Sequence, residues 1–355
     1  MKSTWAFYSN FSLFALSFLF VSTSFGLQIF KTGNPTDLVT STKPAVCLAG
    51  GGSDDAWAQG WNYLLRQSGG GDIVIIRADQ ERGGYESWIY NDDDHHGFPK
   101  VNSVSTISIE NAADANHADV VDTILKAELI FFAGGDQSTY IDWFLNSKLT
   151  KAVNYMIHSK RIPVGGSSAG MALLAGIDYT GKYPSPRDQH SNVSSDDVLK
   201  DPTGYFVDLD PRVLTAPFLK GVITDTHFSE RSRQGRLVGF MARAVYNKYP
   251  DMNFKNIKSI AADEDTAVCY NPTGVAKIYG HGNVFFLRGL SQPERVQVGL
   301  SLDWNADGNA VSAYVISGQN NKASFDLRSW TGFSGRQEFW SVDGQNEDAP
   351  ILIRK

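Results

Sequence analysis

The sequence predicts an α/β protein built on a parallel β-sheet. Short apolar runs at residues 45–49, 72–77, 101–109 and 129–133 alternate with stretches whose apolar residues recur at helical spacing. Glycine clusters follow several of these runs, as is typical of loops at the carboxyl ends of parallel strands. The chain has 42% hydrophobic and 20% charged residues, which is ordinary for a globular protein and argues against a disordered or fibrous chain.

The predicted elements follow one another in strand–helix order. Residues 45–49 form an apolar strand that ends at three glycines, and Asp54 and Asp55 then begin a helix that carries Trp57 and Trp61. The same reasoning predicts, in chain order, strands at 72–77 and 101–109, a helix at 119–126, a strand at 129–133, a helix from about residue 139, and a short apolar segment at 162–164. Strands that alternate with helices pair in parallel, so we expect helices on both faces of the sheet.

Two later segments depart from this alternation. The stretch 179–219 is rich in Pro, Asp and Ser, and we expect it to be a long loop over the domain. From residue 284 onward, apolar runs and turn signals predict β-structure. We therefore divide the chain into a main domain at residues 44–290 and a small β-rich C-terminal extension at residues 291–355.

The N-terminus has the features of a secretory signal peptide. Lys2 precedes the apolar run 11–21, and small residues follow at 22–26. The run is shorter than the roughly 20 apolar residues that a membrane-spanning helix needs. We expect residues 1–26 to be removed and the mature protein to be secreted or periplasmic; a retained membrane anchor is the alternative.

The charge of the sequence limits the classes of partner that the protein can bind. The net charge is −6 and no long basic run occurs, which argues against nucleic acid as the main partner. No membrane association is expected after signal removal, and the sequence is compatible with a homodimer.

Cys47 and Cys269 each lie in an apolar segment that predicts a buried strand. Two free buried cysteines are favoured over a disulfide, although exported proteins can keep disulfides.

The motif Gly-Ser-Ser-Ala-Gly at residues 166–170 matches the G-x-S-x-G pattern of a nucleophilic serine. A serine on a tight strand-to-helix turn exposes its hydroxyl, and flanking glycines permit the crowded backbone. Ser168 is thus the candidate nucleophile, and the backbone N–H of Ala169 is a candidate oxyanion donor. A second glycine turn at residues 134–135 follows the strand at 129–133, and there Gly135 is the second candidate donor and Gln137 could hold the substrate. An ordinary capped turn is the alternative at this second site.

His227 is the candidate base, because it closes the apolar stretch 221–224 and a serine hydroxyl needs a base to take its proton. Arg231, Arg233 and Arg236 follow it, and helical spacing puts Arg233 within an apolar stripe. A buried guanidinium needs an anionic partner, either a protein carboxylate or a substrate carboxylate. The sequence leaves both open.

Two acidic segments contain further candidate functional residues. The triplet at residues 263–265 could supply the carboxylate that orients the histidine, but the pattern does not choose among its three members. The run Asp-Asp-Asp-His-His at residues 92–96 could bind a metal, although a solvated acidic loop is favoured. We therefore predict no metal site.

Together these segments resemble the cyanophycinases, in the serine peptidase family that also contains aspartyl dipeptidases. The resemblance covers residues 44–290 and rests on four motifs in the same order, at residues 131–137, 166–170, 225–236 and 263–267. It implies an α/β fold of the class I glutamine-amidotransferase type, a three-layer sandwich with a mostly parallel sheet. It also implies a Ser-His-Glu triad and no metal or organic cofactor.

Carried onto this sequence, the resemblance makes Ser168 the nucleophile, His227 the base and Glu264 the orienting acid. The residues expected around the substrate are Gln137, Asp225, Arg231, Arg233 and Arg236.

Cyanophycinases cleave β-linked aspartyl-arginine units from a polyaspartate chain that bears arginine, so the expected substrate is a peptide or such a polymer. Thr226 stands where cyanophycinases commonly have Gln, and the loop before His227 is longer. These departures leave an isoaspartyl or acidic dipeptide peptidase as an alternative, and a catalytically silent carboxylate-binding protein as another.

Overall fold

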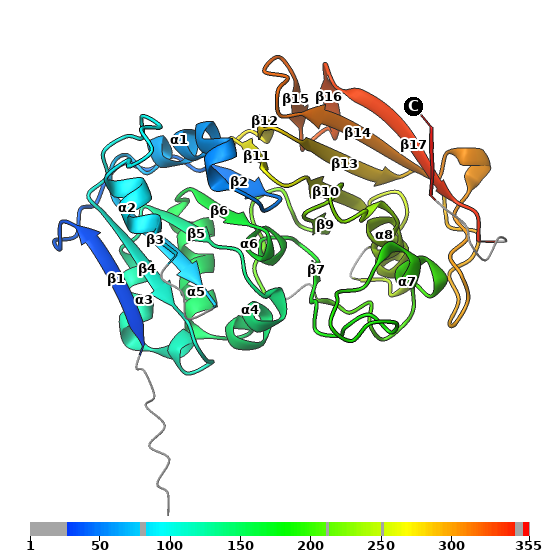
Figure 1. Ribbon diagram of the computed structural model, residues 1–355, viewed down its shortest axis with the longest axis horizontal. Coiled ribbons are helices and arrows are strands. Elements are labelled where there is room, and N and C mark those ends of the chain that lie inside the picture. Colours follow the sequence, from blue (N-terminus) through cyan, green and yellow to red (C-terminus); the bar gives the residue numbers. More distant parts are fainter. Residues whose placement is uncertain (1–26, 79–82, 211–212, 250–251, 345–350, 355) are drawn as a thin grey trace, which may run out of the picture.

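The computed structural model describes residues 27–78, 83–210, 213–249, 252–344 and 351–354. The predicted signal peptide at residues 1–26 lies outside them. The described chain forms two large packed sheets and a short two-stranded sheet, with helices around them (Figure 1). Within the described residues, no helix is long and apolar enough to cross a membrane.

The larger sheet has ten strands, and its centre is parallel as predicted. In spatial order its strands are β1 (Gln28–Gly33), β4 (Ser103–Ser108), β3 (Asp72–Arg77), β5 (Leu129–Phe132), β6 (Val164–Ser167), β2 (Val46–Ala49), β11 (Thr266–Tyr270), β12 (Val275–Gly280), β15 (Ser324–Asp326) and β16 (Thr331–Phe333). Strands β4, β3, β5, β6 and β2 run parallel to one another, and the strands on either side of them are antiparallel. The α/β fold predicted from the alternating pattern is therefore observed.

Helices cover both faces of this parallel centre because alternate residues of each strand point to opposite faces. In β5, Phe131 packs in one apolar cluster and Phe132 in another. One face carries η1 (Asp54–Trp57), α1 (Ala58–Gln67) and α2 (Tyr85–Tyr90). The other face carries η2 (Asp114–Asn116), α3 (Ala118–Leu125), α4 (Gln137–Phe144), α5 (Lys148–Tyr155), η3 (Met156–Lys160) and α6 (Ala169–Leu173).

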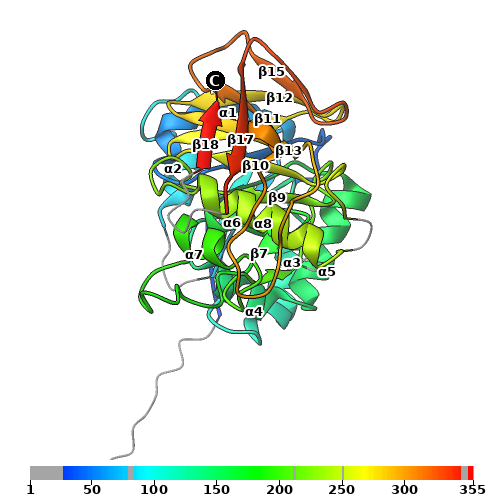
Figure 2. The ribbon, with the colours of Figure 1, turned by 90° about the vertical axis from the view of Figure 1, so that its right-hand side faces the viewer.

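The second sheet has six strands and packs against the first. In spatial order they are β18 (Ile351–Arg354), β17 (Arg336–Val342), β14 (Val311–Ser317), β13 (Asn283–Gly289), β10 (Lys258–Ala262) and β9 (Val222–Asp225). Phe286 of β13 stacks on Phe325 of β15 with ring centroids 3.8 Å apart, which joins the two sheets. Helix α8 (Gln234–Tyr246) packs on the opposite face, and β17 and β18 lie toward the viewer in Figure 2.

The residues after 290 are β-rich, and their strands extend both sheets. Strands β14, β17 and β18 continue the six-stranded sheet from β13, and β15 and β16 continue the ten-stranded sheet from β12. A short helical turn, η4 (Ala306–Gly308), precedes β14. Strands β9 and β10, which lead to the candidate base and acid, thus belong to the sheet that the C-terminal residues enlarge.

The prediction of a loop throughout residues 179–219 is wrong in part. The segment contains helix α7 (Ser195–Lys200) and strand β8 (Leu209–Asp210), which pairs with β7 (Asp178–Tyr179). Ser194 and Asp197 form a reciprocal capping box at the start of α7, which favours a helix in spite of the polar composition.

The preference for free cysteines is also wrong, because Cys47 and Cys269 form a disulfide. Strands β2 and β11 are antiparallel neighbours, and their register places the two cysteines directly opposite each other. The cysteines are 222 residues apart in sequence, so only the strand order reveals that they meet.

Candidate active site

Ser168 sits on the sharp turn between β6 and α6, with φ of 52° and ψ of −116°. This backbone conformation is unusual for a residue with a side chain. The neighbouring glycines are required by close packing: a Cβ at Gly166 would lie 2.4 Å from the Gly170 backbone, and one at Gly170 would lie 2.1 Å from the Phe132 carbonyl oxygen. The turn has the form that the G-x-S-x-G pattern predicts.

His227 lies two residues after the end of β9 and faces the serine. Its Nε2 lies 2.7 Å from the Ser168 Oγ, within hydrogen-bonding distance. Its backbone N–H donates to the Gly50 carbonyl at 2.8 Å. A Cβ at Gly51 would lie 2.3 Å from the imidazole, so this glycine lets the ring lie against the loop after β2. Sequence reasoning missed Gly51; the glycine cluster that ends β2 was its signal.

Glu264 is the member of the acidic triplet that reaches the histidine. Its Oε1 lies 2.6 Å from the His227 Nδ1. Asp263 is buried and accepts hydrogen bonds from Ser229 and Asn283 instead. Asp265 accepts from the Ser53 backbone N–H at 2.6 Å. The two aspartates hold the turn between β10 and β11, and Glu264 is left to orient the imidazole.

Burial lowers the pKa of His227 from its ordinary value of 6.5. The hydrogen bond to Glu264 acts in the opposite direction and raises this pKa, whereas the positive charges of Arg231 and Arg233 lower it further. The net direction favours the neutral imidazole at pH 7, which is the form that can accept a proton from Ser168.

A cavity of about 310 Å³ opens beside these groups. It is lined by Gly135, Asp136, Gln137, Ser168, Gly181, Asn192, Thr226, His227, Arg231 and Arg233. Gly135, one of the two candidate oxyanion donors, lines this cavity, and Ala169, the other, is the first residue of α6 and follows Ser168 directly. The Gln137 side-chain amide donates to the Tyr179 carbonyl, which fixes its orientation.

The structure separates the predicted substrate residues into two groups. Arg231 and Arg233 line the cavity together with Gln137. Asp225 and Arg236 lie behind it, where they are buried and paired with each other. For Arg233, the partner that the sequence left open is a protein carboxylate, Asp225, 3.4 Å from its Nη1, and Arg236 pairs with the same aspartate.

Sequence reasoning also missed two residues that line the cavity, Gly181 and Asn192. Both belong to the long segment 179–219, which loops back over the site. No spacing pattern ties them to Ser168. Only the prediction that this segment covers the domain pointed to them.

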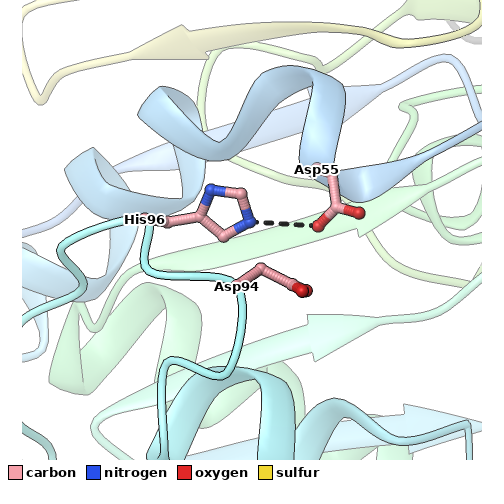
Figure 3. Close-up of side chains that lie close together, drawn as sticks. All are labelled: Asp55, Asp94 and His96. Carbon is pink, nitrogen blue, oxygen red and sulfur yellow. Dashed lines mark hydrogen bonds and ion pairs between the residues drawn. The ribbon is translucent and has the colours of Figure 1, made fainter.

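The acidic loop at residues 92–96 lies outside this site and meets the start of η1. His96 Nε2 is 3.1 Å from Asp55 Oδ1, and Asp94 lies beside them (Figure 3). The Trp88 indole N–H also donates to Asp55 Oδ1, at 2.8 Å. Asp55 and Asp94 are exposed and His96 is partly buried, and one ligand atom from each of the three lies within 4.8 Å of the others, a spacing at which they could hold a metal ion.

Comparison with known proteins finds similarity to cyanophycinases in sequence and to a peptidase in fold. No family model matches the chain. It is 23% identical over 184 residues to the cyanophycinase of Synechococcus elongatus, a match that covers 52% of this chain and 49% of that one. It is 20% identical over 186 residues to the cyanophycinase of Geminocystis herdmanii, covering 52% and 58%. The chain spans about half the length of the curated relatives that it matches.

A crystal structure of a peptidase from an acI-B1 Actinobacterium has a similar fold, with a TM-score of 0.50 and 17% identity. The match covers 71% of this chain and 93% of that one. The chain thus resembles cyanophycinase-like peptidases in sequence and shares its fold with a protein described as a peptidase.

Proposed function

We propose that this chain is a serine-type peptidase of the cyanophycinase kind. It would hydrolyse aspartyl-type peptide bonds, with the β-Asp-Arg units of cyanophycin as the favoured substrate. The observation that carries the proposal is the hydrogen-bonded series Ser168–His227–Glu264, with distances of 2.7 and 2.6 Å. Three groups from distant parts of the sequence meet there beside a polar cavity, as acyl transfer through a serine requires.

The reaction follows from this geometry. His227 Nε2 takes the proton of Ser168 Oγ as the oxygen attacks the carbonyl carbon of the scissile bond. The Gly135 and Ala169 N–H groups stabilise the oxyanion, aided by the start of α6. The imidazolium, stabilised by Glu264, then gives its proton to the leaving amine. Water, deprotonated by His227, hydrolyses the acyl-enzyme and restores Ser168.

The cavity suits a small anionic group. Arg231 and Arg233 bring positive charge to its wall, and a guanidinium binds a carboxylate with paired hydrogen bonds. Its volume of about 310 Å³ is at the lower end of ligand sites, which suits one or two residues at the end of a chain. The same features fit an isoaspartyl or acidic dipeptide. Cyanophycin and such dipeptides differ in their leaving groups, so the leaving group that the protein accepts decides between them.

Two further proposals accompany this function. We propose export of the protein, which the Cys47–Cys269 disulfide supports because disulfides persist in oxidising compartments. We also retain a class I glutamine-amidotransferase-like three-layer arrangement as the description of the fold, supported by the parallel centre of the ten-stranded sheet with helices on both faces.

Replacing Ser168 by Ala tests the proposal. We expect kcat on cyanophycin or on short aspartyl peptides to fall by about 10⁶-fold, as when other serine peptidases lose their nucleophile. Ser167→Ala, one residue earlier on the same turn, is the matched control and should keep its activity. Release of products would be followed by mass spectrometry on both substrates. Undiminished hydrolysis by the Ser168 variant would refute the mechanism, and absence of hydrolysis by the unaltered protein would favour a silent binding protein.

A further inference from the structure

Arg231 lies between the triad and the cavity. Its Nη2 is 4.0 Å from Glu264 Oε1, the same oxygen that accepts the His227 Nδ1–H. The Arg231 side chain is 50% exposed, and the residue lines the cavity together with Ser168. The guanidinium can therefore reach either the triad acid or a group bound in the cavity.

The other two arginines of this segment have fixed positions. Arg236 makes paired contacts with Asp225, and its side chain is only 3% exposed. Arg233 donates to the Thr226 carbonyl at 2.8 Å and lies 3.4 Å from Asp225 Oδ1. Arg231 has a looser and more exposed contact, so it is the cation that can change partner at low cost.

The charges around His227 come from two segments of the chain. Glu264 reaches the ring from the β10–β11 turn, and Arg231 and Arg233 reach it from the segment that follows the histidine. Ser168 and Gly51, on the remaining sides, bring no charge, whereas Glu230, next to Arg231 in the chain, brings a carboxylate that accepts a hydrogen bond from the Glu264 backbone N–H at 3.1 Å. Any anion that neutralises an arginine in the cavity therefore acts on the histidine as well.

We propose that Arg231 couples recognition of an anionic substrate to the basicity of His227, by exchanging the Glu264 carboxylate for the substrate carboxylate. The inference rests on the proposed function. With the cavity empty, the arginine opposes protonation of the imidazole and partly neutralises Glu264. With a carboxylate bound, Arg231 pairs with it, and Glu264 acts on the imidazole alone. Anionic substrates would then raise kcat in addition to lowering KM.

Titration of His227 by NMR tests this coupling without requiring turnover. The probe is succinate, a small dicarboxylate, with its neutral diamide as the control ligand. His227→Gln identifies the resonance. We expect succinate to move the His227 titration to higher pH and the diamide to leave it unchanged. In Arg231→Gln the titration of the free protein should already lie at higher pH, and the shift caused by succinate should be smaller.

Arg231→Lys separates charge from geometry. It keeps the positive charge, so the titration of the free protein should stay close to that of the unaltered protein. A structural role of the arginine would instead affect both variants alike. If Arg231→Gln titrates like the unaltered protein with and without succinate, the inference is wrong.

Kinetics supply the second measurement and separate the inference from the proposed function. The pH profile of kcat/KM reports the free enzyme and that of kcat reports the substrate complex. For an acidic peptide, we expect the kcat profile to rise at higher pH than the kcat/KM profile; for its Asn isostere, the two should coincide. Coinciding profiles for both peptides would overturn the coupling while leaving the peptidase intact. Absence of turnover would overturn the proposed function, and the NMR titration would still decide the coupling.

Discussion

Of the arginine–carboxylate pairs near the histidine, Arg236–Asp225 and Arg231–Glu264 differ in almost every physical respect. Arg236 and Asp225 are both 3% exposed and are joined by two hydrogen bonds. Arg231 and Glu264 are 50% and 35% exposed and approach only to 4.0 Å. The first pair lies in a low-dielectric interior and fixes the backbone, whereas the second lies in solvent and can respond to a ligand.

The surroundings of Arg236 explain why its pair is rigid. The guanidinium lies 5.1 Å from the centre of the Tyr179 ring and 5.4 Å from that of Phe240, and it donates to the Val193 carbonyl. Asp225 lies on β9 two residues before His227. The buried pair thus ties the strand that leads to His227 to α8 and to the segment that covers the cavity. Two chemically similar pairs have different roles because one is buried and the other is not.

The largest expected effect concerns the exposed pair. Glu264→Gln should lower kcat by about 10⁴-fold, because an amide neither stabilises the imidazolium nor fixes its tautomer. The free energy of unfolding should change by less than about 1 kcal/mol, since the side chain is one-third exposed. Steady-state kinetics and urea unfolding measure the two quantities, with Asp265→Asn as the neighbouring control. If the Glu264→Gln variant keeps nearly full activity, Glu264 does not belong to the triad.

For the buried pair, we expect the larger effect to be on stability. Asp225→Asn leaves the buried guanidinium groups of Arg236 and Arg233 without their shared counter-charge, and we expect a loss of about 3–5 kcal/mol in unfolding free energy. The double variant Asp225→Leu, Arg236→Met leaves only Arg233 without this counter-charge, and it should be more stable than the single variant, which leaves two arginines without it. If the single variant unfolds like the unaltered protein, the pair is less important than its burial indicates.

The sequence predicted the parts of the site that depend on local chemistry. The turn at Ser168 follows from the glycines on either side, and the strand that ends before His227 follows from its apolar run. The choice of Glu264 from the acidic triplet came from the family resemblance, because all three acids suit a turn. The structure gives Asp263 and Asp265 backbone partners that no pattern reveals.

What could not be predicted depends on strand order and on contacts between distant segments. Cys47 meets Cys269 only because β11 lies beside β2. Asn192 lines the cavity because the segment before α7 folds back over the carboxyl ends of the strands. The division at residue 290 rested on a change of pattern along the chain. A pattern along the chain cannot reveal strand pairing, which joins β13 to β14 across that point.

The smallest effect concerns the stability contributed by Arg231. Because its contact with Glu264 is long and exposed, Arg231→Ala should change the free energy of unfolding by no more than about 0.5 kcal/mol. Whatever effect remains should disappear in high salt, since solvent-exposed charges are screened within about 10 Å at 0.1 M ionic strength. Urea unfolding at low and high salt measures both. A loss above about 2 kcal/mol that persists in salt would mean that the arginine is a structural anchor like Arg236, and that it is not free to exchange partners.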